Sequence, residues 1–302
     1  MKTKARKVGL LFLSLFLVAA TAGCPAPVDE LDRLTSAELE ERIIDALPAV
    51  ETVQFEQKTV HKFMDKVAGE VVDRRTTSTT IGVIDMVRKR STATSTWVSS
   101  WREAVVSEGE ARGYFVDGVY YSKRSEPEMP AQWIKWEGPW NPMTLPTEMI
   151  IRWLNMSELE LLGTEKVRGF NCFVVSVVPD MEMFFQEQMR KLQETRHAFP
   201  EAVEELPSPQ ELEAMIRDKL RDLTFKLWVC KDTFLPVREH QKWTGVDTFG
   251  DLEVIGVMDT TTYFVYNQPV TIDLPPEAAY AVCREEFFDQ PVMPPEPPPA
   301  IP

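Results

Sequence analysis

The chain has 302 residues, and its 33 Lys and Arg stand against 47 Asp and Glu, which gives a formal net charge of −14. Such an acidic protein repels the phosphate backbone of nucleic acids, so we expect no nucleic-acid partner. Because 44% of the residues are hydrophobic, the chain can bury the core of one large domain or two small ones.

The N-terminus has the charge order of a secretory signal peptide. An uncharged stretch, 8–23, is rich in Leu and Phe and is shorter than the ~20 apolar residues that a membrane-spanning helix needs. The cations that precede it are Lys2, Lys4, Arg6 and Lys7. This pattern predicts export from the cytoplasm.

The end of this stretch, Thr-Ala-Gly-Cys at 21–24, resembles the lipobox of bacterial lipoproteins, although Thr21 stands where the motif usually has Leu. In those proteins the cysteine thiol receives a diacylglycerol and becomes the new N-terminus. The resemblance implies a lipoprotein signal peptide at 1–23, lipidation of Cys24, a tether at 24–34 and a lipid anchor in the outer face of the cell membrane. The alternatives are an ordinary cleaved signal peptide and an uncleaved anchor.

The folded part is predicted to begin with a helix. Thr35 and Glu38 have the spacing of a capping box, and Leu39, Ile43 and Leu47 then recur on one helical face. Segments dense in Val, Ile, Thr and aromatic residues follow and predict strands at 52–60, 76–90 and 92–101.

Two hairpins are predicted farther along the chain. Asp117-Gly118 supplies the residue pair of a tight primed turn between the arms of segment 113–123, and segment 132–138 continues the sheet. After a short helix carrying Ile150 and Trp153, segment 159–180 predicts a second hairpin, whose second strand, 170–178, is apolar on both faces and therefore covered on both.

A helical insert is predicted at about 180–222. Apolar residues recur at helical spacing on either side of a loop, and Ser208 and Glu211 form a second capping-box pattern. Strands then resume at 223–233, 235–244 and 251–275, before a proline-rich tail, 289–302, that we expect to be extended and exposed. Helices segregated to one face of an antiparallel sheet predict an α+β domain.

Five segments resemble successive strands of the LolA-like lipoproteins, which include the lipid-binding LppX and LprG type. They are GVID at 82–85, YFVDGVYYSK at 114–123 with WIKW at 133–136, GFNCFVVSVVPD at 169–180, LWVCKDTFLPVRE at 227–239 and YNQPVTIDLPPEA at 266–278. The resemblance implies that residues 35–288 form a curved antiparallel sheet, a half-open barrel closed on its concave side by helices. The insert at 180–222, which would be the lid, is longer than in LolA itself.

In such a fold the helices would line an apolar cavity, and flexible Met and aromatic side chains suit that role. The candidates in the insert are Phe184, Phe185, Met189, Met215 and Ile216, and the weaker candidates elsewhere are Trp133, Trp136 and Trp153. The alternative is that these stripes are ordinary core.

The cysteines do not have metal-ligand spacing, so we expect no metal and no cofactor. If segments 170–178 and 223–231 are antiparallel neighbours, Cys172 and Cys230 can form a cross-strand disulfide, with Cys283 as a competing partner. His61, His197 and His240 are isolated in sequence, and neither an H-E-x-x-H nor a G-x-S-x-G motif occurs. The sequence therefore predicts no enzyme.

The interpretation that follows is a membrane-anchored lipoprotein of the cell envelope that binds, and in one version transfers, a lipid or other hydrophobic small molecule. The alternative is an envelope sensor that uses the same half-barrel to bind a protein partner, as RseB-type members of this superfamily do. A carrier should keep an open apolar interior, whereas a partner-binding module should expose an apolar patch over a filled core.

Overall fold

The structure is a computed structural model of the whole chain, which divides into two compact units, Met1–Leu34 and Thr35–Pro302. The ranges that it describes are 34–67, 70–102, 104–125, 131–140, 146–198, 208, 210–211, 213–214, 223–249 and 252–284. The expected signal peptide, Cys24 and the proline-rich tail lie outside the described residues.

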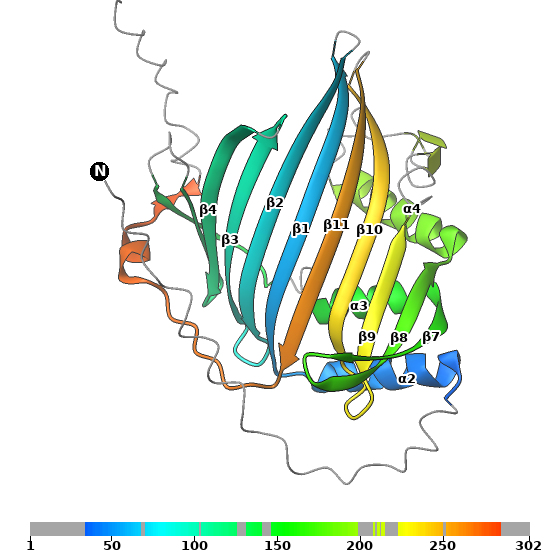
Figure 1. The fold of residues 1–302 in the computed structure, drawn as a ribbon. Helices are drawn as coiled ribbons and strands as arrows, with labels where there is room; N and C mark the ends of the chain where they lie inside the picture. Colours follow the sequence, from blue (N-terminus) through cyan, green and yellow to red (C-terminus); the bar gives the residue numbers. More distant parts are fainter. Residues whose placement is uncertain are drawn as a thin grey trace, which may run out of the picture. The chain divides into compact units, whose positions relative to one another are not determined.

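Twelve strands form one sheet in the described part of the chain, in the order β12-β6-β5-β4-β3-β2-β1-β11-β10-β9-β8-β7 (Figure 1). The strands are β1 (Thr52–Val67), β2 (Glu70–Asp85), β3 (Arg90–Trp101), β4 (Ala104–Val116), β5 (Val119–Ser125), β6 (Trp133–Glu137), β7 (Ser157–Val167), β8 (Phe170–Pro179), β9 (Thr224–Cys230), β10 (Pro236–Phe249), β11 (Leu252–Tyr266) and β12 (Val282–Cys283). All neighbours are antiparallel except β12 and β6. The sheet has two edges, β12 and β7, and is therefore not a closed barrel.

The first and last long strands lie together at the middle of the sheet. β1 pairs with β11 from Val53 opposite Tyr266 to Asp65 opposite Val254. This pairing joins the meander β2–β6 to the strands β7–β10, so the expected antiparallel sheet of an α+β domain is confirmed.

The tight turns follow the predicted chemistry. Asp117 and Gly118 have φ values of 53° and 83°, as a type I′ turn requires, and Arg168 and Gly169 have 47° and 97° between β7 and β8. Glycine adopts such angles without a Cβ penalty. Both hairpins predicted from the sequence are present.

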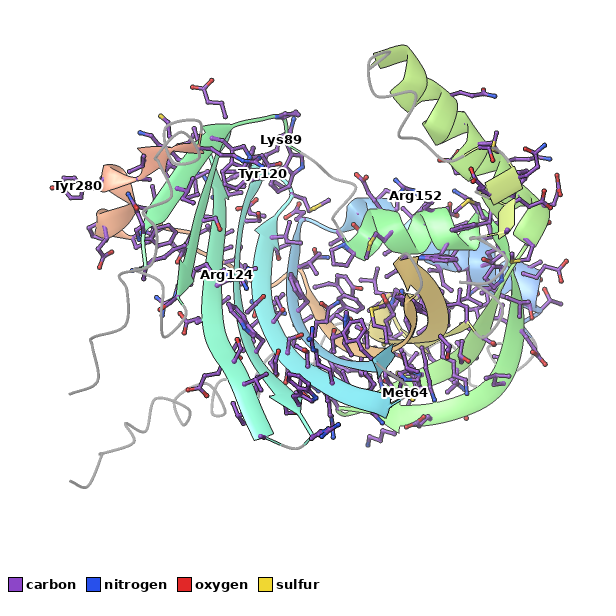
Figure 2. The ribbon with its side chains drawn as sticks, turned by 90° about the horizontal axis from the view of Figure 1, so that it is seen from above. Met64, Lys89, Tyr120, Arg124, Arg152 and Tyr280 are labelled. Carbon is purple, nitrogen blue, oxygen red and sulfur yellow. The ribbon has the colours of Figure 1, made fainter. Side chains whose placement is uncertain are left out.

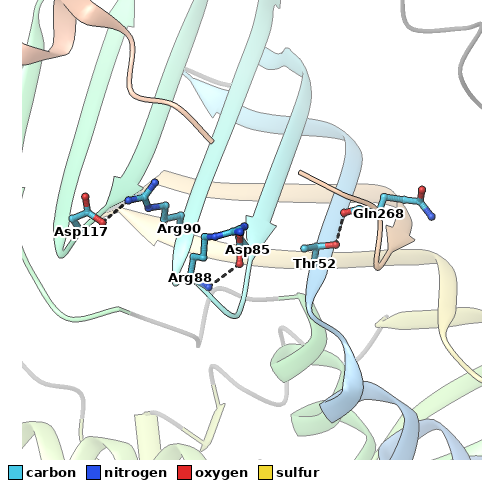
Figure 3. A network of polar contacts seen from close by, with 6 residues as sticks. All are labelled: Thr52, Asp85, Arg88, Arg90, Asp117 and Gln268. Atoms are coloured by element: carbon cyan, nitrogen blue, oxygen red, sulfur yellow. Dashed lines mark hydrogen bonds and ion pairs between the residues drawn. The ribbon is translucent and has the colours of Figure 1, made fainter. Parts of the chain in front are cut away.

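Polar contacts hold the strand ends near α2 (Figure 3). The Arg88 guanidinium lies 2.9 Å from the Asp85 carboxylate, Arg90 lies 2.8 Å from Asp117, and the Thr52 hydroxyl donates to the Gln268 carbonyl. Burial of Asp85 opposes its ionisation, but hydrogen bonds from the Arg88 backbone and side chain outweigh burial and lower its pKa.

Three α-helices accompany the sheet in the described residues: α2 (Ser36–Ala46), α3 (Pro146–Leu154) and α4 (Met181–Ala198). The Thr35–Glu38 capping box forms as predicted. Ser208 and Glu211 likewise exchange capping hydrogen bonds. Short 3-10 turns lie at Leu47–Ala49 and Pro276–Tyr280.

The helices meet the sheet mainly near one edge. α2 and α3 contact each other and β7, and α3 also contacts β8. The apolar core lies there and includes Leu39, Ile43, Ile150, Leu154, Phe173, Val175, Phe225 and Leu227, all at most 1% exposed. Closure of the whole concave side by helices stays a prediction.

Cys172 lies opposite Cys230 in the pairing of β8 with β9, which confirms the predicted register. The Lys231 N–H donates to the Asn171 carbonyl, so 172/230 is a non-hydrogen-bonded pair, in which the side chains lie closest. Both cysteines are free and buried in the structure, and burial, together with Cys230, raises the pKa of Cys172 to about 11. A thiol of this kind forms little thiolate, so oxidation should be slow.

We propose that Cys172 and Cys230 form a disulfide when the protein is exported to an oxidising compartment. Peptide mapping of the exported protein under non-reducing conditions should recover one peptide pair joined through these residues. The Cys283→Ser variant should give the same pair, because this control removes the competing partner. Alkylation of Cys172, Cys230 and Cys283 together in the unreduced protein would contradict the proposal.

Candidate functional site

The concave face of the sheet is the face that carries Phe225, against which the α3 residue Trp153 packs at 5.6 Å between ring centroids. Side chains alternate along a strand, so the strand registers place every residue of this face in rows that cross the sheet. One row contains Ser95, Thr80, Gln57, Thr262, Glu239 and Leu227, and the next contains Trp97, Ser78, Thr59, Thr260, Gln241 and Phe225. Figure 2 shows the curved sheet from above, roughly along its strands, with Arg124 of β5 and Arg152 of α3 labelled.

Six polar side chains in the middle of these rows form what we call the polar belt: Gln57, Thr59, Glu239, Gln241, Thr260 and Thr262. Thr59, Glu239, Thr260 and Thr262 are each at most 9% exposed. The Thr59 and Thr260 hydroxyls are 3.1 Å apart, and the Gln57 amide donates to Thr262 at 3.4 Å. Buried polar groups are costly unless they are bonded, and cross-strand partners satisfy Gln57, Thr59, Thr260 and Thr262.

Glu239 is the one carboxyl of the belt, and it is 4% exposed. The Gln241 amide donates to it at 2.6 Å. Burial raises the pKa of Glu239 to about 7, and the bond from Gln241 opposes the shift only partly. Burial also raises the pKa of Tyr266, with a smaller contribution from the charge of Glu239.

Four aromatic rings on this face lie next to glycines. A Cβ placed at Gly82, Gly109, Gly245 or Gly256 would meet the ring of Phe55, Trp97, Trp243 or Phe63, respectively. The four aromatic residues are only half-buried. The glycines thus leave room at the backbone for these rings.

The β3–β5 part of the concave face carries small side chains: Ser91, Ala93, Ser95, Ala111, Gly113 and Ser122. A Cβ at Gly113 would meet nothing nearer than the Tyr121 carbonyl oxygen at 3.9 Å. The face is therefore open at this position.

The candidates predicted from sequence are distributed over several places. Trp153 stacks on Phe184 at 5.3 Å, so these two lie together beside Phe225. Phe185 and Met189 are half-buried on α4. Met215 and Ile216 lie outside the described residues.

Trp133 and Trp136 point to opposite faces of β6, because an odd number of residue steps separates them. Trp136 stacks on Tyr120 at 5.3 Å and lies on the concave side. Trp133 packs instead against Ala278 and Ala281 on the outer face. Trp133 thus lies on the opposite face of the sheet from Trp136, and its role in a cavity stays a prediction.

Sequence reasoning missed the belt and the rings of Phe55, Phe63, Trp97 and Trp243. Polar and apolar residues alternate in 52–64, which is a signal that the sequence offers. Only the pairing of β1 with β11, and of β11 with β10, brings Gln57 into one row with Thr262 and Glu239.

Two hollows open to solvent lie near the helices. One, of about 460 Å³, is lined by Glu148, Ile151, Arg152, Asn155, Met156 and Glu187. The other, of about 510 Å³, lies along the β7 edge and is lined by Ser36, Glu158, Leu159, Glu160, Leu161 and Val178. Within the described ranges, no three His, Cys, Asp or Glu residues come together as a metal site. No helix in this part of the chain is long and apolar enough to cross a membrane.

No protein-family model matches the chain, and no curated protein matches it. Among solved structures it is similar to LprF from Mycobacterium bovis, with 12% identity, 83% of this chain and 99% of that chain covered, and a TM-score of 0.38. It is also similar to the lipoprotein LppX of Mycobacterium tuberculosis, with 11% identity, 79% and 100% coverage and a TM-score of 0.33.

A third similar structure is the MucA–MucB complex of Pseudomonas aeruginosa, with 15% identity, 74% of this chain and 56% of that chain covered, and a TM-score of 0.25. The resemblance to LppX-type lipoproteins thus recurs in the comparison of structures, at low identity.

The pKa of Glu239 makes stability depend on pH. An unfolded glutamate titrates near 4.5 and the folded one near 7, so between these values the folded state holds the extra proton. The free energy of unfolding should therefore fall as pH rises from about 4.5 to 7 and then level off.

Denaturant unfolding measures the free energy of unfolding of wild type and of Glu239→Gln at each pH. The difference between the two free energies should change by on the order of 2 to 3 kcal/mol between pH 4.5 and pH 7. The exposed Glu137→Gln is the matched control and should follow wild type. Parallel curves for wild type and Glu239→Gln would mean that Glu239 titrates normally.

Proposed function

We propose that this chain is a membrane-anchored lipoprotein of the cell envelope that binds a lipid or other amphiphile along the concave face of its sheet. The observation that carries the proposal is the set of aromatic rings lying next to glycines: Phe55, Phe63, Trp97 and Trp243 are half-buried instead of packed. A packed core would bury these rings, because protein interiors are filled to crystal-like density.

The same surface suits an acyl chain. Each CH₂ group that leaves water contributes about 0.8 kcal/mol, and the half-buried rings of Phe55, Phe63, Trp97 and Trp243 offer apolar contact around the polar belt. Trp153 and Phe184, which are half-buried and stack on each other, extend this surface toward α3 and α4. Phe185, Met189, Met215 and Ile216 on the insert would complete the lid in this proposal.

A second candidate function, binding of an envelope protein, is favoured by a different surface. Strand β7 is a sheet edge, and Leu161, Leu162 and Val178 beside it are 38%, 46% and 48% exposed. Exposed apolar residues on an unpaired edge suit the addition of a strand from another protein. In this version the concave face need not bind lipid.

The Gly113→Leu variant separates the two functions. Leu would project from an open position of β4 and occupy the concave face without a clash, since Gly113 has ordinary backbone angles and no atom within 3.9 Å of its Cβ position. We expect binding of a fluorescent fatty acid to weaken about tenfold or more, which corresponds to 1.4 kcal/mol. The thermal midpoint should not fall, because glycine is a poor strand former.

The control is Thr96→Leu, which adds similar bulk to the exposed outer face of β3 and should leave fatty-acid binding unchanged. Organic extracts of the purified wild-type protein, analysed by mass spectrometry, should contain a bound amphiphile. Equal binding by both variants, or an empty extract together with no fatty-acid binding by wild type, would favour the protein-binding function.

The anchor is tested at Cys24. If this cysteine carries the lipid, Cys24→Ala should release the protein from the membrane fraction of the producing bacterium, because the described residues contain no helix that could hold it there. Fractionation followed by a carbonate wash measures this. A variant that stays in the membrane after the wash would argue for an uncleaved N-terminal anchor.

A further inference from the structure

Glu239 is a buried carboxyl without a cationic partner. Its only hydrogen-bond partner in the described part of the chain is the Gln241 amide, and no Lys, Arg or His contributes to its pKa. Buried carboxylates in proteins are normally paired with a cation or a metal, because an unpaired charge is expensive to remove from water. This exception lies on the face that we propose binds amphiphiles.

The neighbours of Glu239 are suited to a polar group at the end of an apolar chain. Thr262 lies directly opposite on β11 and Leu227 on β9. Gln241 is half-buried, whereas Glu239 is 4% exposed, so the surface opens in the direction of Gln241 and then Trp243. Polar oxygens and an aromatic surface therefore adjoin the carboxyl.

We propose that Glu239 binds the ammonium group of a cationic amphiphile, so that the preferred ligands of the concave face are long-chain amines. An ammonium group has three donors and no acceptor. The Glu239 carboxylate and the Thr262 hydroxyl lie opposite each other on β10 and β11, and the Gln241 amide oxygen lies in the next row on β10. These three acceptors can share the donors. This inference rests on the proposed function and names the class of ligand.

The same arrangement disfavours anionic amphiphiles, because a carboxylate or phosphate beside Glu239 would place two like charges in a poorly solvated site. Arg124, which lies over the Trp97 ring at 4.9 Å, is on β5, several strands away. An uncharged alcohol can donate a single hydrogen bond and gains no charge pairing. Amine, alcohol and carboxylate of equal chain length should therefore bind in that order.

The test compares dodecylammonium, dodecanol and dodecanoate, each displacing an uncharged fluorescent fatty alcohol from the full-length protein at pH 8. Wild type should bind the amine about tenfold more tightly than the alcohol, equivalent to 1.4 kcal/mol. In Glu239→Gln, which keeps the size of the side chain and removes its charge, the two affinities should become equal. Glu137→Gln, an exposed control, should keep the wild-type preference.

A second readout is the pH dependence of the preference. Protonation of Glu239 removes the charge that attracts the amine, so the preference of wild type for the amine over the alcohol should disappear at pH 5.5. Glu239→Gln should bind the two ligands equally at both pH values. Tyr266, which interacts with Glu239, stays protonated throughout because burial raises its pKa.

The outcomes separate this inference from the proposed function. If all three ligands bind but wild type prefers none, or if Glu239→Gln keeps the preference, the ammonium site is wrong and the amphiphile-binding function stands. If no ligand binds to wild type, both are wrong.

Discussion

The pairing of β1 with β11 is the interaction on which the rest of the structure depends. It joins the first long strand to the last, from Val53 opposite Tyr266 to Asp65 opposite Val254, and so makes one sheet from two runs of hairpins. Pairing strands so distant in sequence loses more chain entropy than forming a local hairpin. The hydrogen bonds and the burial along β1 and β11 must offset this larger loss. Every row that crosses the middle of the sheet passes through this pairing.

The composition of the concave face follows from it. Because Gln57 meets Thr262, and Thr262 meets Glu239, polar residues of three strands gather between apolar neighbours. Glycines on the same or a neighbouring strand leave room for the aromatic rings, so the face combines a polar centre with half-buried rings. A carboxyl in such surroundings loses its hydration without gaining a counter-charge, which is the physical origin of the raised pKa of Glu239.

The two faces of the sheet are covered differently. On the outer face, Trp228, Cys172 and Cys230 form a buried cluster, and the Arg238 guanidinium lies 4.0 Å from the centre of the Trp228 ring. The segment with Ala278 and Ala281 covers Trp133 farther along the same face. The concave face meets its helices mainly at β7 and β8. Apolar surface that the chain itself covers stabilises the fold, whereas half-buried rings on the concave face are available to a ligand.

Local chemistry determined the elements of this protein from sequence alone. The Thr35–Glu38 cap, the Asp117-Gly118 turn and the opposition of Cys172 and Cys230 depend on residues close in sequence or joined by one connection. Even the divergence of Trp133 and Trp136 follows from the two-residue period of a strand. The tertiary structure alone decided that Gln57 and Glu239 share a face and a row, because strand pairs distant in sequence are selected by the combined burial of many residues, which no local pattern encodes.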